Sequence, residues 1–123
     1  MGTKKTILLV DDSESIREAV GFMLRQAGYI VCEACSGVDA LNFFDGRSFH
    51  LLLTDYHMPE MNGLELISRI RQMNLYKYLP VLVLTTEHQK EMIMAAKQAG
   101  ATGWLNKPFE QQKLLQTVRR LIR

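Results

Sequence analysis

The sequence of 123 residues has no long hydrophobic run. Its uninterrupted apolar stretches are a few residues long, well short of the ~20 that a membrane-spanning helix needs. Near the N-terminus, Lys4 and Lys5 precede only the short apolar run 7–10 before Asp11 follows, so the apolar core of a secretory signal is missing. We therefore expect a cytoplasmic protein that makes no use of a membrane.

Charge of one sign and cysteine are also scarce. A net charge of +2 is too small to indicate direct nucleic-acid binding. The sequence contains no glycine-rich phosphate loop, so nucleotide binding is not expected. The two cysteines, Cys32 and Cys35, lie in the segment YIVCEAC, which is typical of a strand. Side chains three positions apart in a strand point to opposite faces, so a redox or metal pair is not expected.

What the sequence does contain is a regular alternation of short aliphatic runs and helical patterns. The predicted strands cover residues 7–10, 30–34, 51–54, 81–84 and 103–105. Apolar residues at helical spacing predict helices over 16–27, from 40 to near Gly46, and over 64–71, 92–99 and 114–122. The segment RQMNLYKYLP, residues 71–80, is expected to be an exposed loop.

Five successive strand-then-helix units predict a parallel sheet covered by helices on both faces. The strands lack alternation of apolar and polar residues, as expected when both faces of a sheet are buried. Because crossovers in such sheets are right-handed, few arrangements remain, and the strand order 2-1-3-4-5 is favoured. Residues 1–123 are then expected to form one α/β domain.

Polar side chains stand where four of the predicted strands end. Strand by strand, these are Asp11 and Asp12, then Asp55, then Thr85 and Thr86, and finally Lys107 before Pro108. The carboxyl ends of parallel strands share one edge, where open α/β sheets bind their ligands. Each residue alone has an ordinary explanation, such as a helix cap or a solvated side chain. Their joint placement predicts a functional site.

Three carboxylates at one edge repel one another. Two of them ~4 Å apart oppose each other by about 4 kcal/mol at an effective dielectric of ~20, so a proton or a cation must compensate. Oxygen ligands on a partly open edge suit Mg²⁺, or Mn²⁺ in its place. We expect Asp11 and Asp12 to hold the ion, and Asp55 both to hold it and to attack phosphorus. Lys107 and Thr85 would stabilise the transferring phosphoryl group.

Four segments, ILLVDDS, LLLTDYHMPEMNGLEL, PVLVLTTE and AGATGWLNKPF, resemble the receiver domain of response regulators. The resemblance covers essentially the whole chain, which is similar to the single-domain, CheY-like chemotaxis regulators. It implies a flavodoxin-like (βα)5 fold with strand order 2-1-3-4-5. It also implies that Asp55 takes a phosphoryl group from a histidine kinase or phosphotransfer protein. The Mg²⁺ would be held by Asp11 or Asp12, Asp55 and the backbone carbonyl of His57.

The resemblance implies roles for three further residues. Lys107, joined to Pro108 by a cis bond, would contact the phosphoryl oxygens, and Thr85 would move to meet them. Trp104 occupies the place of the aromatic switch residue, although plain core packing explains it as well. The surface formed by 92–99, 103–105 and 114–122 would then change shape for a downstream protein target.

Positions that tune the lifetime of the phosphoryl group in the family are occupied by three residues. Thr86 stands where many relatives carry a smaller residue, so it is expected to narrow access to Asp55. His57 and Glu87 lie two residues after Asp55 and Thr85, where they would orient or block the attacking water. For His57, a solvated loop imidazole is an equal alternative.

The protein is not expected to be a turnover enzyme, since it would catalyse only its own phosphorylation and dephosphorylation. It is expected to be a monomer or a weak phosphorylation-dependent dimer.

An alternative function, an aspartyl-phosphate phosphatase, would need a D-x-D nucleophile motif, which DDS and DYH both lack. A docking module that works without phosphorylation would have no need of the complete acid, threonine and lysine set. A receiver domain cut from a longer transcription factor or hybrid kinase stays open as an alternative.

Overall fold

The structure is a computed structural model that describes residues 4–86 and 90–122. Strands and helices alternate along it: β1 (Thr6–Val10), α1 (Glu14–Gln26), β2 (Ile30–Ala34), α2 (Gly37–Leu41), β3 (Leu51–Asp55), α3 (Gly63–Arg71), β4 (Val81–Thr85), α4 (Lys90–Ala99), β5 (Gly103–Asn106) and α5 (Gln111–Leu121). The strands form one parallel sheet in the order β2-β1-β3-β4-β5, which confirms the predicted topology.

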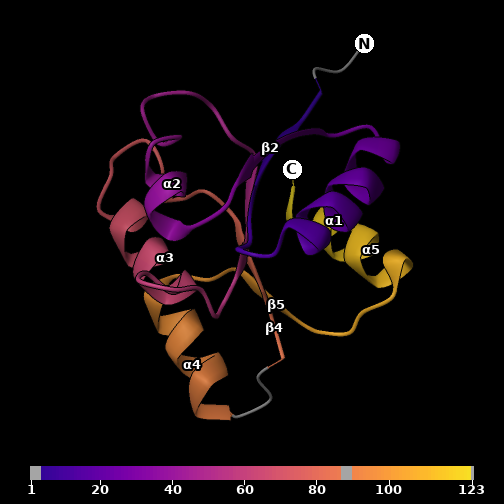
Figure 1. Cartoon of the computed structure of the whole chain (residues 1–123). Helices are drawn as coiled ribbons and strands as arrows, with labels where there is room; N and C mark the ends of the chain where they lie inside the picture. The colour runs from indigo at the N-terminus through magenta and orange to yellow at the C-terminus, as the bar shows by residue number, and fades with distance from the viewer. Residues whose placement is uncertain (1–3, 87–89, 123) are drawn as a thin grey trace.

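The sheet is the middle layer of three. In Figure 1, α1 and α5 lie on one side of it and α2, α3 and α4 on the other. Alternate residues of each strand enter two separate apolar clusters: Leu8 and Val10 belong to the cluster under α2 and α3, Ile7 and Leu9 to the cluster under α1 and α5. This two-sided burial is why the strands read as continuous aliphatic runs. Among the helices of residues 4–86 and 90–122, none combines the length and apolarity needed to cross a bilayer.

The turns that follow β1 and β3 are fixed by helix caps. Ser13 caps α1, its hydroxyl accepting a hydrogen bond from the backbone N–H of Ile16 at 3.3 Å. Asn62 and Glu65 form a reciprocal capping box at α3, with bonds of 2.9 Å and 3.2 Å. Such caps satisfy N–H groups that the first helical turn leaves unpaired. They hold the chain in a defined path just after the two strands that carry the acids.

The second helix is shorter than the sequence predicts. Its last residue is Leu41 rather than a residue near Gly46. Beyond it, the N–H groups of Phe43 and Phe44 bond to carbonyls three residues back, those of Ala40 and Leu41, in the tighter geometry of a 3₁₀ turn. Phe44 still reaches the core, which explains why its spacing looked helical.

The expectation of an exposed loop over 71–80 is wrong for two of its residues. Tyr76 and Leu79 are buried, 4% and 7% exposed. The Tyr76 hydroxyl donates to the carbonyl of Arg47 and accepts from the N–H of Gly46, both at 2.8 Å. These bonds attach the loop before β4 to the connection before β3, at the edge of the sheet where those strands begin.

A close approach at Gly63 generates a test of this packing. A Cβ there would lie 2.5 Å from the backbone oxygen of Asp55 and 3.3 Å from the Cα of Tyr56. Because both neighbours are backbone atoms, neither can rotate aside. We predict that Gly63→Ala lowers the free energy of unfolding by about 1–3 kcal/mol, measured by urea denaturation. The control, Ser68→Ala on the exposed side of the same helix, should stay within about 0.5 kcal/mol. Equal unfolding midpoints for the two variants would contradict the prediction.

Candidate functional site

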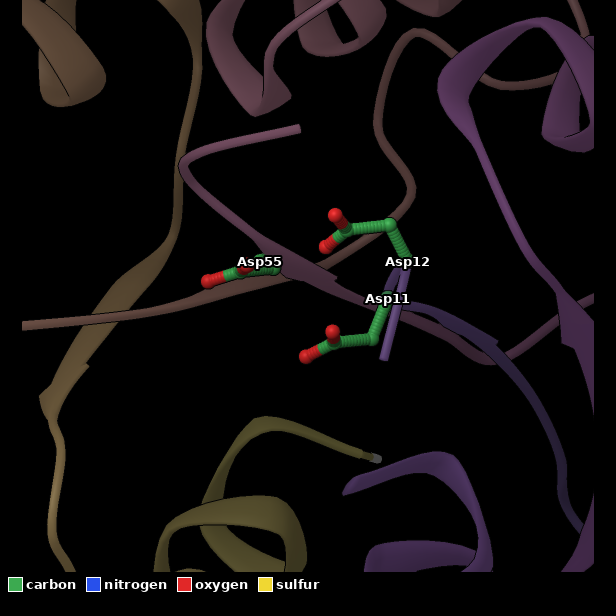
Figure 2. Close-up of side chains that lie close together, drawn as sticks. All are labelled: Asp11, Asp12 and Asp55. Carbon is green, nitrogen blue, oxygen red and sulfur yellow. The ribbon is translucent and has the colours of Figure 1, made fainter. Parts of the chain in front are cut away.

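The three predicted acids meet at the carboxyl edge of the sheet. One carboxylate oxygen from each of Asp11, Asp12 and Asp55 lies within 4.8 Å of the other two. Figure 2 shows the three side chains extending in the same direction from the ends of β1 and β3. Asp11 and Asp55 are buried and Asp12 is exposed. The cluster therefore has a buried floor and one side open to solvent.

Lys107, just past β5, brings a positive charge to the two buried acids. Its Nζ lies 3.3 Å from Oδ2 of Asp11 and 3.2 Å from Oδ1 of Asp55. The three side chains are 19%, 2% and 12% exposed, so the contacts are little screened by water. One ammonium is thus shared between two carboxylates, with a third carboxylate close by.

The electrostatic balance of the site appears in the ionisation of Asp55. Burial is the largest influence and raises the pKa of this carboxyl above its ordinary 3.8. The Lys107 ammonium acts in the opposite direction, while the negative charge of Asp11 adds to the rise. Since the pKa remains raised, one ammonium does not compensate for the burial of the carboxylate. The site favours either a proton or a further cation.

The donor set fits a hard divalent cation. Carboxylate oxygens on a partly open edge are ligands for Mg²⁺ or Mn²⁺, whereas structural zinc sites prefer nitrogen and sulfur. Asp11, Asp12 and Asp55 could each supply one oxygen. His57 lies two residues beyond Asp55, and its side chain is exposed. The centroid of its ring is 4.7 Å from the centroid of the Tyr56 ring. The role of its backbone carbonyl as a ligand stays a prediction.

The backbone of β4 fixes the position of Lys107. Thr85 is fully buried at the end of that strand, and its carbonyl accepts the N–H of Lys107 at 2.7 Å. The bond from Lys107 to Pro108 is cis, as the resemblance implied. Thr86, the next residue, is exposed. Glu87, the remaining residue predicted to tune the phosphoryl lifetime, lies outside the described residues.

Tyr56 is a residue of the site that the sequence analysis missed. Its N–H donates to Oδ1 of Asp55 at 3.0 Å, and its hydroxyl donates to the sulfur of Met92 on α4 at 3.5 Å. Its ring packs edge-on against Trp104 of β5, with centroids 5.8 Å apart. Tyr56 thus joins the central acid to two of the elements expected to change shape. The one feature of the sequence that could have identified Tyr56 is its position as an aromatic residue directly after Asp55.

Trp104 is half-buried among the apolar residues beneath α3 and α4. Its indole Nε1 is buried and has no hydrogen-bond partner within residues 4–86 and 90–122. A buried donor without a partner costs about 1–3 kcal/mol. Core packing therefore explains why the ring of Trp104 is buried, but it does not explain why its N–H group is buried.

Comparison with known proteins gives consistent matches. The family model of the response regulator receiver domain matches residues 7–119. The chemotaxis protein CheY of Pseudomonas aeruginosa is 36% identical over 116 residues, which cover 94% of each chain. The structure of the chemotaxis response regulator CheY4 of Vibrio cholerae has a TM-score of 0.92 at 42% identity, covering 98% of this chain and all of that one.

A second similar structure is the receiver domain of a sensor histidine kinase from Pseudomonas aeruginosa, which contains a magnesium ion coordinated in its active-site cleft. It has a TM-score of 0.88 at 26% identity, covering 97% of this chain and 98% of that domain. Sequence and fold agree over nearly the full length of the relatives as well as of this chain. The chain therefore belongs to the response regulator receiver family, among its CheY-like members, which act in two-component signalling.

Proposed function

We propose that this protein is a phosphorylation-dependent switch in which Asp55 takes a phosphoryl group from the phosphohistidine of a kinase or phosphotransfer protein. The observation that carries the proposal is a buried Asp55 carboxylate with Lys107 Nζ at 3.2 Å and two further acids beside it. In the transfer, the phosphorus–nitrogen bond to histidine breaks and a phosphorus–oxygen bond to Asp55 forms. The histidine nitrogen keeps the electron pair of the broken bond.

The cation belongs to the same proposal. Asp11 or Asp12, Asp55 and the backbone carbonyl of His57 would hold Mg²⁺ or Mn²⁺. When bound, the ion neutralises charge on the phosphoryl oxygens. The support is the geometry of the three acids, the raised pKa of Asp55, and the magnesium seen in the related receiver domain.

Lys107 and Thr85 act on the phosphoryl group once it has arrived. The ammonium already lies against Asp55, so it needs only a small movement to donate to a phosphoryl oxygen. The Thr85 hydroxyl would supply a second donor from the neighbouring strand. His57, Thr86 and Glu87 would set how fast water removes the group. Since the chain acts only on its own phosphoryl group, we do not class it as a turnover enzyme.

The effect of phosphorylation would be transmitted through the aromatic pair Tyr56 and Trp104. Tyr56 is bonded to the carboxylate that would be modified and packs on Trp104, whose N–H has no partner among the described residues. A second orientation of Trp104, in which this N–H formed a hydrogen bond, would be close in free energy to the orientation described. The new hydrogen bond would offset the cost of moving the ring. Phosphorylation would then bias an existing equilibrium and reshape the face of α4, β5 and α5 for a downstream protein.

The cellular setting completes the proposal. The chemotaxis relatives favour the same kind of pathway for this chain, and the cytoplasm is the compartment in which such a protein would meet its kinase. We propose that it acts there as a monomer or a weak phosphorylation-dependent dimer, without direct contact to nucleic acid or membrane.

Replacing Asp55 tests the phosphoacceptor. With acetyl phosphate and Mg²⁺, the wild type should gain the mass of one phosphoryl group, measured by intact-protein mass spectrometry. Asp55→Asn should gain none, because an amide is not a nucleophile toward phosphorus. Asp45→Asn, which changes an exposed acid paired with Arg47, should label like the wild type. Full labelling of Asp55→Asn would refute the assignment.

Trp104 emission tests the switch. This is the sole tryptophan of the chain, so fluorescence reports on one indole. Beryllofluoride with Mg²⁺ mimics the phosphoryl group and should change the intensity or wavelength of emission, because the environment of the ring changes. Asp55→Asn is the control and should show no response. If fluorine NMR shows that the wild type binds beryllofluoride while its emission stays constant, Trp104 is a packing residue only.

A further inference from the structure

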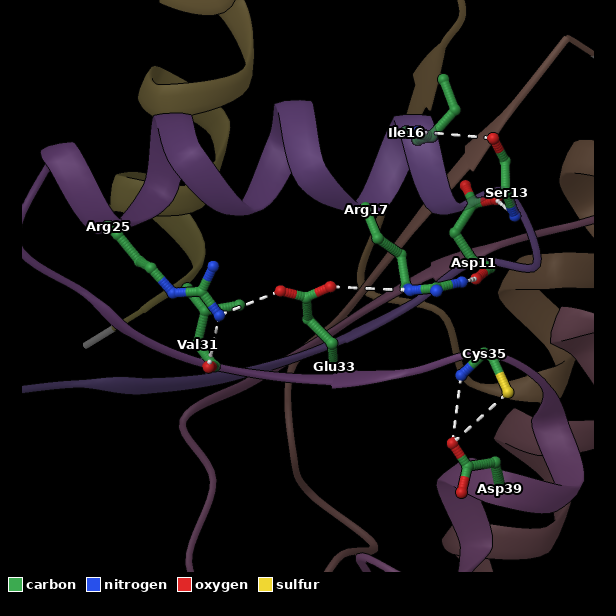
Figure 3. Close-up of polar contacts among 9 residues, drawn as sticks. All are labelled: Asp11, Ser13, Ile16, Arg17, Arg25, Val31, Glu33, Cys35 and Asp39. Atoms are coloured by element: carbon green, nitrogen blue, oxygen red, sulfur yellow. Dashed lines mark hydrogen bonds and ion pairs between the residues drawn. The ribbon is translucent and has the colours of Figure 1, made fainter.

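A line of charged contacts runs from α1 and β2 to the first acid of the site (Figure 3). Glu33 on β2 lies between two arginines of α1. Its Oε1 is 3.5 Å from Nε of Arg17, and its Oε2 is 3.0 Å from Nη2 of Arg25. Arg17 also donates from Nη1 to the backbone carbonyl of Asp11 at 2.6 Å. One guanidinium therefore connects Glu33 to the backbone of the acidic cluster.

The carbonyl that Arg17 binds belongs to the peptide that joins two of the acids. A peptide unit is planar, so the carbonyl of Asp11 and the N–H and Cα of Asp12 move together. Fixing this oxygen restricts rotation about the backbone bonds on both sides of the peptide, and so restricts the directions in which the two side chains leave the backbone. Arg17 thus acts on Asp11 and Asp12 at once, through the backbone that joins them.

The other polar groups of Asp11 already have partners. Its N–H donates to Ala34 at 3.2 Å, and its Oδ1 accepts from the N–H of Ser13 at 2.9 Å. Its Oδ2 faces Lys107 at 3.3 Å. Because Asp11 is only 2% exposed, water is a poor substitute for Arg17 at the carbonyl. Without the guanidinium, the peptide would have to turn to satisfy its oxygen.

Glu33 and the helix itself hold Arg17 in place. The carboxylate faces the guanidinium and offsets part of the charge of Arg17, which reduces the repulsion toward an incoming cation. Gly21, in the middle of α1, leaves room for the neighbouring contact between Glu33 and Arg25. A Cβ at Gly21 would lie 3.1 Å from Nη1 of Arg25 and 3.4 Å from Oε2 of Glu33. Glycine is otherwise a poor helix residue, so the room it provides is a physical reason for its presence.

We infer that Arg17 is a positioning residue for the divalent cation, and that it orients the Asp11–Asp12 peptide so that both carboxylates face Asp55. Glu33 supports it by fixing the guanidinium. The inference rests on the proposed function, because the cation is the one that would assist phosphoryl transfer. It adds a requirement on a residue that contacts neither the phosphoryl group nor the ion.

The test measures Mg²⁺ binding directly, without a phosphodonor. Arg17→Met removes the donor and keeps an apolar stem, so the Kd for Mg²⁺ by calorimetry should rise about tenfold, as for other residues that hold a metal ligand in place. Arg17→Lys keeps a charged donor and should give an intermediate Kd. The matched control is Arg25→Met, which removes the other partner of Glu33 and leaves the Asp11 carbonyl bonded. It should bind Mg²⁺ like the wild type.

The outcomes separate this inference from the proposed function. If Arg17→Met binds Mg²⁺ like the wild type, even with lower thermal stability, Arg17 is only structural and the inference fails. Equal weakening by Arg25→Met would also overturn it, as would a wild type that binds no Mg²⁺. If Arg17→Met alone binds Mg²⁺ weakly while the wild type takes no phosphoryl group, the positioning role stands and the proposed function falls. A raised Kd for Mg²⁺ in Arg17→Met, together with full labelling of the same variant at saturating Mg²⁺, would support both.

Discussion

The repulsion among three carboxylates at one edge of the sheet is the constraint on which the rest depends. Their oxygens lie within 4.8 Å of one another, two of the acids are buried, and a single ammonium lies between those two. Separate parts of the fold keep them together. The parallel sheet places the ends of β1 and β3 side by side, helix caps fix the turns that follow, and Arg17 holds the peptide between the first two acids. The molecule thus maintains an unfavourable charge arrangement that a cation can relieve.

In the proposed function, this constraint explains how one modification would influence a distant surface. Asp55 sits where charge is poorly compensated, so a phosphoryl group and its cation would change the local electrostatics strongly. The same residue is bonded to Tyr56, which contacts Met92 on α4 and Trp104 on β5. The N–H of Trp104 has no partner within the part of the chain that the structure describes, so it would gain a hydrogen bond if the ring took a second orientation. In our proposal, phosphorylation at the carboxyl edge of the sheet is therefore coupled to the shape of the α4, β5 and α5 surface through two aromatic rings.

The sequence predicted the parts of the molecule that follow from local pattern. Aliphatic runs and helical spacing predicted the strands and the acids at their ends, because burial on both faces leaves a characteristic composition. The strand order was favoured by the right-handed crossover rule and implied by the family resemblance. The sequence could not predict the contacts that side chains make with other parts of the packed fold. The bond from Arg17 to Asp11, the anchoring of Tyr76, and the links made by Tyr56 depend on how each helix and loop is rotated in the packed fold. The early end of α2 was missed because Phe44 keeps helical spacing in a non-helical turn.

Thermal unfolding of the wild type and Asp55→Asn, in EDTA and in Mg²⁺, tests the central claim most directly. Burial raises the pKa of Asp55 in the folded chain, so its ionised form costs stability once the pH rises above its ordinary 3.8. In EDTA at pH 7, Asp55→Asn should therefore unfold at the higher temperature, and this advantage should vanish as the pH falls below 3.8. Mg²⁺ should stabilise the wild type far more than the variant. A variant less stable in EDTA, or equally stabilised by Mg²⁺, would contradict the account.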